Sequence, residues 1–188
     1  MKISVRIRPI QLGDTEKIVK WRNNPKVKKQ LYTQSDLTLE QHNNYFQSKI
    51  LTGEVKQFII VVDDDNKELE VGTTFLKSID NYSHKAEFGI FIGEDTSRVK
   101  GYGSQATKLT LDYGFKELGL NRVYLTVLAD NSIAINAYKK VGFQLEGILK
   151  QDYKRNNTFV DVAIMGIVRE DWERLVNYGT NKSNKSTN

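Results

Sequence analysis

Hydrophobic and polar positions along the chain follow two different periods, and each period predicts its own kind of element. Val5-Arg6-Ile7-Arg8 alternates apolar and charged residues, which predicts a short, half-buried strand that Pro9 ends. Longer runs rich in β-branched and aromatic residues predict further strands. These strands are expected over residues 57–62, 71–79 and 86–92, over 122–128, from Phe143 onward, and over 158–168.

Apolar residues spaced three or four positions apart predict amphipathic helices between the strands. Asp14 is suited to cap the first helix, which stops near Pro25. Thr38 begins a capping box for a second helix that runs to about Leu51.

The second half of the chain predicts three more helices. The loop 93–100 leads into an amphipathic helix, a second helix is expected over residues 132–141, and Asp171 is suited to cap a short final helix. The core-facing residues of the helix after the loop are Ala106, Leu109, Tyr113 and Phe115.

This order of elements predicts an α+β protein. It contains one β-α-β-α-β stretch, so we expect a mixed, mostly antiparallel central sheet with helices on both faces. A chain of 188 residues is consistent with a single domain, expected over residues 1–178. The polar, low-complexity segment 179–188 is expected to be a disordered tail.

Composition excludes several classes of chemistry. With no cysteine, the chain has no disulfide, no thiolate nucleophile and no Cys-ligated metal. His42 and His84 lie far apart in the sequence, so neither a Ser-His-Asp triad nor a metal site is expected. No apolar run approaches the ~20 residues that a membrane span needs, and the start of the chain lacks a signal-peptide pattern. We therefore expect a cytoplasmic protein.

The formal net charge of +5 favours anionic partners, which include phosphorylated cofactors and nucleic acid. Most basic residues are dispersed, as on an ordinary solvated surface, and no nucleic-acid-binding motif is present, which makes nucleic acid an unfavoured partner. One cluster is tighter, because Lys26, Lys28 and Lys29 directly follow the segment 21–25.

The strongest local signal is the segment Arg98-Val99-Lys100-Gly101-Tyr102-Gly103-Ser104, placed between a strand and a helix. Its two glycines allow backbone N–H groups to point into a common concavity, and the helix start adds a partial positive charge. Such geometry binds a pyrophosphate. The segment is neither a Walker A loop nor a Rossmann fingerprint. Taken alone, a loop that needs flexible residues to enter a helix explains the glycines equally well.

A second motif follows about thirty residues later. Asn131 and Tyr138 are seven residues apart, about two helical turns, so both can face one side of the predicted helix. Gly142 is suited to end that helix, and Phe143 opens the next strand. An isolated tyrosine at such a position is more often a packing residue than a catalytic one.

Together, the Arg-x-x-Gly-x-Gly loop and the Asn…Tyr…Gly-Phe helix resemble the two motifs of the GNAT superfamily of acetyl-CoA-dependent N-acetyltransferases. The resemblance runs from about Val5 to Trp172. It implies the GNAT fold, with a splayed pair of central strands, and direct acetyl transfer to an amine without a covalent acyl-enzyme. A homodimer remains open, since dimers are common in the superfamily.

The resemblance also implies how acetyl-CoA is held. The amides from Val99 to Ser104, in the loop that begins at Arg98, would hold the pyrophosphate. The backbone at Phe91 and Ile92 would pair with the pantetheine arm, and Asn131 and Asn136 would hydrogen-bond it. The implied cofactor residues are therefore Phe91, Ile92, Arg98, Val99, Lys100, Gly101, Tyr102, Gly103, Ser104, Asn131 and Asn136.

Two catalytic roles follow from the chemistry of the reaction. An ammonium must lose a proton before it attacks a thioester, and the departing thiolate must be protonated or stabilised. Tyr138 resembles the general acid of the superfamily. Glu87, which alternates with apolar residues on the strand leading to the cofactor loop, is the expected base, acting directly or through water. An ion-paired strand residue is nearly as good an explanation of Glu87.

The sequence says less about the acceptor amine. The second half resembles spermidine acetyltransferases, whereas the first half, with Trp21, Arg22 and Asn23, resembles acetyltransferases of 4-amino sugar nucleotides. Those three residues are the expected acceptor-binding group. Ribosomal-protein N-terminal acetyltransferases share features of both halves.

Charge favours one of these acceptors. A nucleotide sugar brings a diphosphate, which the basic segment 22–29 would bind, whereas a polyamine needs carboxylates. An anionic small molecule, a 4-amino sugar nucleotide, is therefore the favoured acceptor, and spermidine or a ribosomal protein is the alternative. A catalytically silent acyl-CoA-binding module also remains open.

Overall fold

The computed structural model describes residues 4–64, 67–94 and 101–183. Within them the chain forms a seven-stranded sheet in the order β1-β2-β3-β4-β5-β7-β6. All neighbouring strands are antiparallel except β4 and β5, which confirms the expected mixed, mostly antiparallel sheet. The strands are β1 (Ser4–Pro9), β2 (Lys56–Asp64), β3 (Lys67–Asp80), β4 (Lys85–Ile92), β5 (Arg122–Leu128), β6 (Gln144–Arg155) and β7 (Thr158–Val168).

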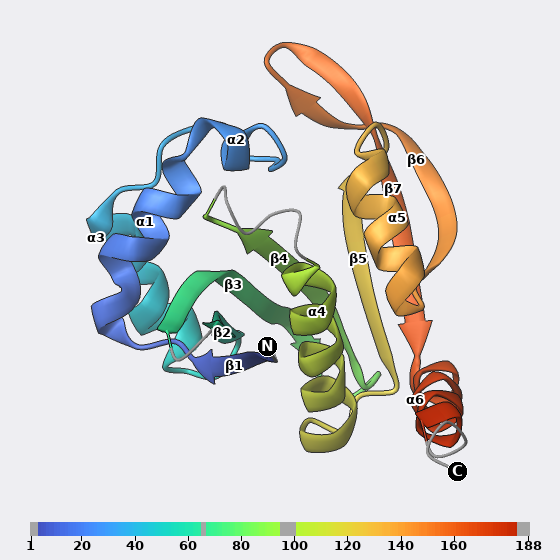
Figure 1. The fold of residues 1–188 in the computed structure, drawn as a ribbon. Coiled ribbons are helices and arrows are strands. Elements are labelled where there is room, and N and C mark those ends of the chain that lie inside the picture. The colour runs from blue at the N-terminus through green and yellow to red at the C-terminus, as the bar shows by residue number, and fades with distance from the viewer. Residues whose placement is uncertain (1–3, 65–66, 95–100, 184–188) are drawn as a thin grey trace.

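Helices cover both faces of this sheet (Figure 1), as expected. They are α1 (Thr15–Asn23), α2 (Pro25–Lys28), α3 (Leu39–Tyr45), α4 (Tyr102–Asp112), α5 (Ser132–Val141) and α6 (Arg169–Ser183). A 3-10 turn, Leu12–Asp14, precedes α1, and the π-helical turns Phe46–Ile50 and Tyr113–Glu117 extend α3 and α4. None of the helices in the described part of the chain combines the length and apolar character that a membrane crossing demands.

Strand β2 explains why both faces are covered. Its central residues are apolar without interruption, and successive side chains of a strand point to opposite faces. Ile59 and Val61 pack with α1 and with the π-helical turn that extends α3, whereas Ile60 and Val62 pack on the face of α4. All four side chains are fully buried.

The final helix differs from its prediction. Helix α6 begins at Arg169, so Asp171 lies inside its first turn rather than capping it, and the helix reaches Ser183, inside the segment expected to be a disordered tail. Trp172 is buried against Phe115, so the first turns of α6 are fixed by packing. Each further residue then adds one hydrogen bond without a new nucleation cost. Residues 184–188 lie outside the described part of the chain.

The prediction that the Asp14 side chain caps α1 is wrong. Asp14 occupies the position before Thr15, but its carboxylate accepts hydrogen bonds from the Arg8 guanidinium, at 2.7 and 2.8 Å, and from the Gln11 amide at 2.8 Å. A bidentate contact with a guanidinium is stronger than a single contact with a backbone amide. The side chain therefore turns back toward β1.

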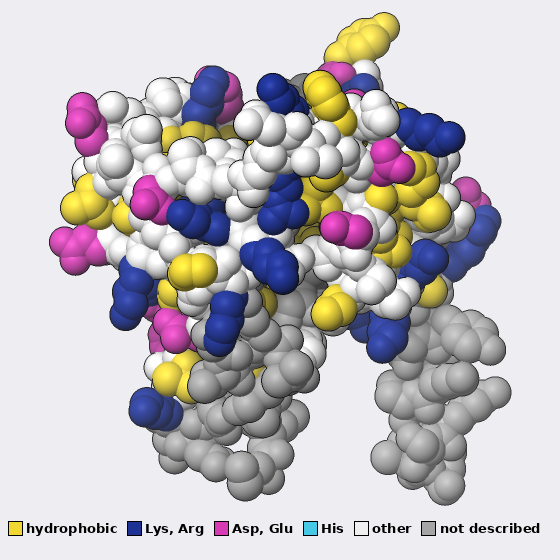
Figure 2. All heavy atoms as spheres, turned by 90° about the horizontal axis from the view of Figure 1, so that it is seen from above, with side chains coloured by type: hydrophobic (Ala, Val, Ile, Leu, Met, Phe, Trp, Pro, Cys, Tyr) yellow, Lys and Arg dark blue, Asp and Glu magenta, His cyan; other side chains and the backbone are white. Residues whose placement is uncertain are grey.

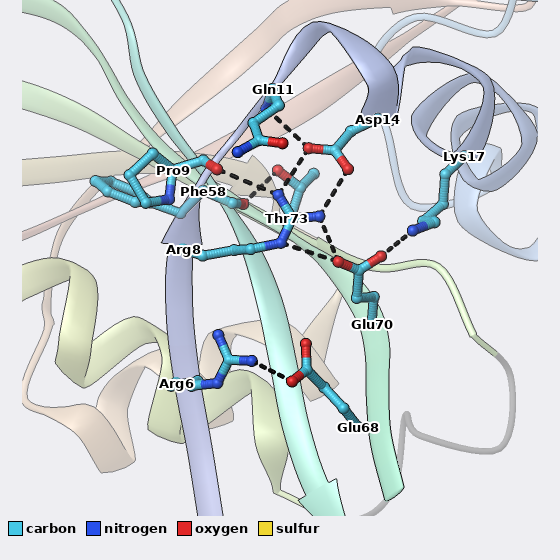
Figure 3. Close-up of polar contacts among 10 residues, drawn as sticks. All are labelled: Arg6, Arg8, Pro9, Gln11, Asp14, Lys17, Phe58, Glu68, Glu70 and Thr73. Atoms are coloured by element: carbon cyan, nitrogen blue, oxygen red, sulfur yellow. Dashed lines mark hydrogen bonds and ion pairs between the residues drawn. The ribbon is translucent and has the colours of Figure 1, made fainter.

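Arg8 is the centre of a network that ties β1, the first turn, α1 and β3 together (Figure 3). Besides Asp14 it contacts Glu70 on β3, and Glu70 also contacts Lys17 on α1. Burial of Asp14 would raise the pKa of its carboxyl, but the hydrogen bonds from Arg8 and Gln11 outweigh burial and lower the pKa. The contact between Arg8 and Asp14 therefore favours the ionised form of Asp14.

We expect Asp14→Asn to lower the free energy of unfolding at pH 7 by about 1–3 kcal/mol, because it weakens the half-buried contact with Arg8. The folded pKa lies below the unfolded value of about 3.9. This stabilisation is therefore complete above the unfolded pKa and is lost as the pH falls through the folded pKa. Urea unfolding of the unaltered protein and of Asp14→Asn at a series of pH values measures the difference in their free energies of unfolding.

Asp36→Asn is the matched control, since the Asp36 carboxylate is 70% exposed and pairs only at the surface with Lys28. It should cost less than about 1 kcal/mol. An equal decrease in the free energy of unfolding in the two variants would contradict this account of the network. So would a decrease for Asp14→Asn that stays the same in acid.

Candidate active site

The site is built on the point where the central strands separate. The parallel pairing of β4 with β5 covers only Lys85↔Arg122, Ala86↔Val123 and Glu87↔Tyr124, although both strands continue. Beyond these pairs the strands diverge (Figure 1). Strand β4 stays paired with β3 as far as Gly72↔Ile92. One edge of β4 is therefore left without a strand partner beyond Glu87.

The register decides which backbone groups lie on this free edge. The Gly93 amide donates to the Val71 carbonyl at 2.8 Å, and the Phe91 carbonyl points at Gly72, where a Cβ would come within 2.3 Å of it. In an antiparallel pair, successive residues direct their backbone groups to opposite edges. The amides and carbonyls of Ile90 and Ile92 thus face the opening, whereas those of Phe91 face β3.

The opening between the strands holds a cavity of about 470 Å³. Its walls come from the segment after α1, from β3, β4 and β5, and from α5. The lining residues are Lys26, Val27, Gln30, Leu31, Tyr32, Phe75, Lys77, Glu87, Phe88, Gly89, Ile90, Phe91, Ile92, Thr126, Val127, Leu128, Asn131, Ile133, Ala134, Ala137 and Tyr138. We call this space the first cavity.

A second cavity, of about 510 Å³, lies between the start of α4 and the face of α5. Its residues are Ile90, Phe91, Ile92, Gly101, Gly103, Ser104, Thr107, Ile133, Ala134, Asn136, Ala137, Tyr138 and Lys140. The two cavities share the end of β4 and one face of α5. Tyr138 lies where they meet. Seen from above, several Lys and Arg side chains lie near the middle of the molecule, with hydrophobic side chains beside them (Figure 2).

The start of α4 offers a cradle for an anion. Gly101 precedes the helix with φ 77°, and a Cβ there would meet nothing within 4 Å. Tyr102 is buried among the core residues and anchors the turn, while Gly103 and Ser104 line the second cavity. The first amides of a helix have no intrahelical partner, so they are available to a phosphate. The predicted residues Arg98, Val99 and Lys100 lie outside the described part of the chain.

Helix α5 has the boundaries that the sequence predicts, and it orients Tyr138. The Asn131 side-chain oxygen accepts the Ala134 amide at 3.1 Å and so caps the helix, which Gly142 ends with φ 122°. Phe88 and Phe143 pack edge-on against the Tyr138 ring. Burial raises the pKa of the Tyr138 hydroxyl to about 12, and the neighbouring Tyr32 contributes. The hydroxyl therefore keeps its proton at neutral pH.

The two predicted asparagines face different cavities. Asn131 lines the first cavity while its oxygen holds the cap, and Asn136 is exposed and lines the second.

Glu87 stands at the last residue pair before the strands separate, and it lines the first cavity. Its side chain is 20% exposed, and Lys77 on β3 approaches its Oε1 atom to 3.2 Å. Both explanations that the sequence left open therefore apply to Glu87, which is an ion-paired strand residue and also a carboxylate at the cavity.

The residues expected to bind the acceptor lie behind the cavity wall, and none of Trp21, Arg22 and Asn23 lines either cavity in the described part of the chain. The Trp21 ring is buried against Gly93, and its indole N–H donates to Glu94 at 2.7 Å.

Arg22 and Asn23 hold the segment that forms the wall. Arg22 donates to the Thr33 carbonyl at 3.0 Å, and Asn23 both donates to and accepts from the Leu37 backbone at 2.8 Å. These contacts fix the chain that carries Tyr32.

Tyr32 lines the first cavity but is not among the site residues expected from the sequence. Its hydroxyl is buried in the cavity wall and makes no hydrogen bond of good geometry among the described residues. Burial raises its pKa, and the neighbouring Thr126 side chain partly offsets this rise. Its ring contacts Tyr153 on β6, with centroids 4.9 Å apart, and Arg155 donates to the Lys29 carbonyl at 2.6 Å. The β6–β7 hairpin thereby fastens this wall. Periodicity gave no signal, because the segment has no regular element.

Comparison with known proteins identifies the family. A family model described as an acetyltransferase (GNAT) domain matches residues 4–144. The chain belongs to the GNAT acetyltransferases. It is an N-acetyltransferase that uses acetyl-CoA, as the resemblance implied.

Several relatives extend over nearly the whole GNAT chain. Spermidine N(1)-acetyltransferase of Escherichia coli K12 is 27% identical over 169 residues, covering 90% of this chain and 88% of the relative. The enzyme of the same name from Vibrio cholerae is 28% identical over 173 residues, covering 92% and 97%. The L-amino acid N-acetyltransferase AaaT of E. coli K12 is 32% identical over a shorter stretch, covering 61% and 69%.

Solved structures agree on the GNAT fold. Spermidine N-acetyltransferase from Vibrio cholerae, in complex with CoA and spermine, superposes with a TM-score of 0.82 at 24% identity, covering 89% of this chain and 97% of that one. At this identity the likeness establishes the fold. Among residues 4–64, 67–94 and 101–183, no cluster of three or more His, Asp or Glu side chains is arranged to hold a metal.

We expect Gly101→Ala to weaken CoA binding about tenfold, equivalent to about 1.4 kcal/mol. A Cβ at φ 77° strains the turn, which disturbs the amides that follow it. Isothermal titration calorimetry with CoA measures the effect.

Gly119→Ala is the matched control, since Gly119 also has positive φ and open space around it but lines neither cavity. Each variant should lose about 1–2 kcal/mol of folding stability. Equal CoA affinity in the two variants would show that Gly101 does not contribute to CoA binding.

Proposed function

We propose that this chain transfers an acetyl group from acetyl-CoA directly to a primary amine of a polyamine of the spermidine class. The observation that carries the transfer chemistry is that a carboxylate, Glu87, and a protonated hydroxyl, Tyr138, line one cavity at the point where β4 and β5 separate. The acceptor class is supported by the spermidine acetyltransferases that match about nine-tenths of the chain.

Binding of the cosubstrate would use both cavities. The amides from Gly101 to Ser104 would hold the pyrophosphate at the start of α4. The free backbone groups of Ile90 and Ile92 would pair with the amides of the pantetheine arm, a one-residue adjustment of the expected Phe91 and Ile92. Asn136 and the remaining amide group of Asn131 would complete the polar contacts. When bound, acetyl-CoA supplies a thioester whose acyl carbon is open to attack by an amine.

Glu87 would prepare the acceptor. An alkylammonium does not attack a carbonyl, so one proton must leave the nitrogen before the C–N bond forms. The Glu87 carboxylate lies at the closed end of the opening, where it can accept that proton directly or through one water molecule. Its partial burial also strengthens its attraction for an ammonium, because water screens the pair less there.

Tyr138 would act on the other side of the reacting bond. Tyr138 lines both cavities, and with a pKa of about 12 its hydroxyl remains a donor throughout the pH range in which enzymes work. It is therefore able to donate a hydrogen bond, and then a proton, to the departing sulfur.

Tyr32 would bind the acceptor itself. A buried hydroxyl that is incompletely hydrogen-bonded is costly, and an amine in the cavity would reduce that cost by pairing with it. Phe75 covers the floor of the same cavity, with its ring directly over Gly89. Aromatic faces and one carboxylate suit an alkylammonium.

A 4-amino sugar nucleotide is the second candidate acceptor, because Lys26 and Lys77 line the first cavity. The neighbouring Lys28 is already neutralised by Asp36 at 2.5 Å, which weakens the case for a diphosphate-binding segment. The spermidine relatives also favour the polyamine.

Release of CoA thiol, followed with a thiol reagent, tests the acceptor. The chain has no cysteine, so the protein adds no background. Spermidine, a 4-amino sugar nucleotide and a ribosomal-protein N-terminal peptide are offered side by side, and turnover is expected with spermidine. Turnover with the sugar nucleotide alone would instead support the second candidate. CoA binding without turnover of any amine would support a silent binding module.

We expect Tyr138→Phe and Glu87→Gln each to lower kcat by about 10²-fold or more, because each removes a proton-transfer group. The affinity for CoA should stay within about twofold, since neither group is placed against the pyrophosphate or the pantetheine amides. Steady-state kinetics and calorimetry with CoA measure the two quantities. Full turnover by either variant would exclude that residue from catalysis.

A further inference from the structure

Lys77 is the residue that pairs with the proposed base. It lies directly opposite Glu87 in the register of β3 and β4, and its ammonium nitrogen is 3.2 Å from Glu87 Oε1. Regular pairing of the two strands shifts just beyond this position, where Ser78 adopts φ 51°. Both side chains line the first cavity. The carboxylate that would receive a proton from the acceptor is thus already ion-paired with a lysine ammonium.

The exposure of the two partners is unequal, and this makes the pair displaceable. The Glu87 side chain is 20% exposed and the Lys77 side chain 42%. A half-buried carboxylate needs a cationic partner, whereas a lysine on a flexible stem can return its ammonium to water at little cost. The lysine end of the pair is close to water, and ion pairs at a protein surface contribute only about 0–1 kcal/mol.

We propose that the Lys77 ammonium is an internal stand-in for the acceptor ammonium. It holds Glu87 while the cavity has no acceptor and must be displaced, or share the carboxylate, when an amine binds. Lys77 would therefore set the affinity for cationic acceptors by competition. This inference rests on the proposed function, because it takes Glu87 as the group that meets the acceptor.

A purely structural ion pair makes a different prediction. If Lys77 only joins β3 to β4, its removal lowers stability and leaves acceptor affinity unchanged or weaker. If Lys77 competes with the acceptor, its removal tightens acceptor binding. The sign of the change in affinity distinguishes the two roles.

The test compares Lys77→Met with the unaltered protein, both with CoA bound, since CoA carries no acetyl group and no turnover occurs. Calorimetric titration with spermidine should give a Kd about two- to fivefold lower for Lys77→Met, the range expected for loss of one exposed competing pair. Lys77→Arg keeps a cation at this position and should retain the weaker Kd. With acetyl-CoA, KM for spermidine should fall in Lys77→Met, in the same direction as the Kd.

Lys85→Met is the matched control, because Lys85 pairs with Asp80 at 4.0 Å on the same two strands and lines neither cavity. Its Kd for spermidine should not change, and thermal unfolding of each variant shows whether it is folded. An unchanged or weaker Kd in Lys77→Met overturns the inference.

Failure of the proposed acceptor would be recognised separately, as absence of spermidine binding and turnover in the unaltered protein. The Lys77→Met comparison is then made with whichever amine the CoA-release assay identifies. Tightening supports the role of Lys77, and no tightening overturns it.

Discussion

The separation of β4 from β5 is the constraint on which the rest of the site depends. Buried amides and carbonyls require partners, and an open strand edge inside a protein is costly unless water or a ligand satisfies it. Here the parallel pairing stops at Glu87↔Tyr124, and the backbone of Ile90 and Ile92 faces an opening. A cosubstrate arm that carries amides would supply the missing partners. The same break places both proton-transfer candidates at one cavity.

An opening in the middle of a sheet must be held at its width, and contacts remote in sequence do this. The Arg8 network fixes β1, β3 and α1 on one side. On the other side the β6–β7 hairpin reaches back to the first half of the chain, where Tyr153 meets Tyr32 and Arg155 meets Lys29. The wall of the first cavity that carries Tyr32 is therefore held by residues from both halves of the chain. Its shape depends on tertiary packing more than on any one element.

The parts of the site that the sequence predicted are those encoded locally. The helix over residues 132–141 and the strand over 122–128 were predicted with the observed boundaries. The residues that set the hydrophobic period of these elements and the residues that end them are close neighbours in the sequence. The cavity wall that carries Tyr32 could not be predicted in this way. The four-residue helix α2 is too short to show a period, and the partners of Arg8 and Glu87 follow from hairpin register. Register depends on a bulge that leaves no composition signal.

The relatives favour a polyamine over the anionic acceptor that the net charge favours, and a related reason accounts for the difference. A net charge of +5 describes the whole surface, whereas an acceptor meets only the groups that line its cavity. The carboxylate that lines that cavity is Glu87, and its ion-pair partner is a lysine that can leave it for water. The dispersed lysines are better suited to the phosphates of the cosubstrate, which lie outside the reacting centre. A basic protein is thus compatible with a cationic substrate when one carboxylate is placed where the amine must lose its proton.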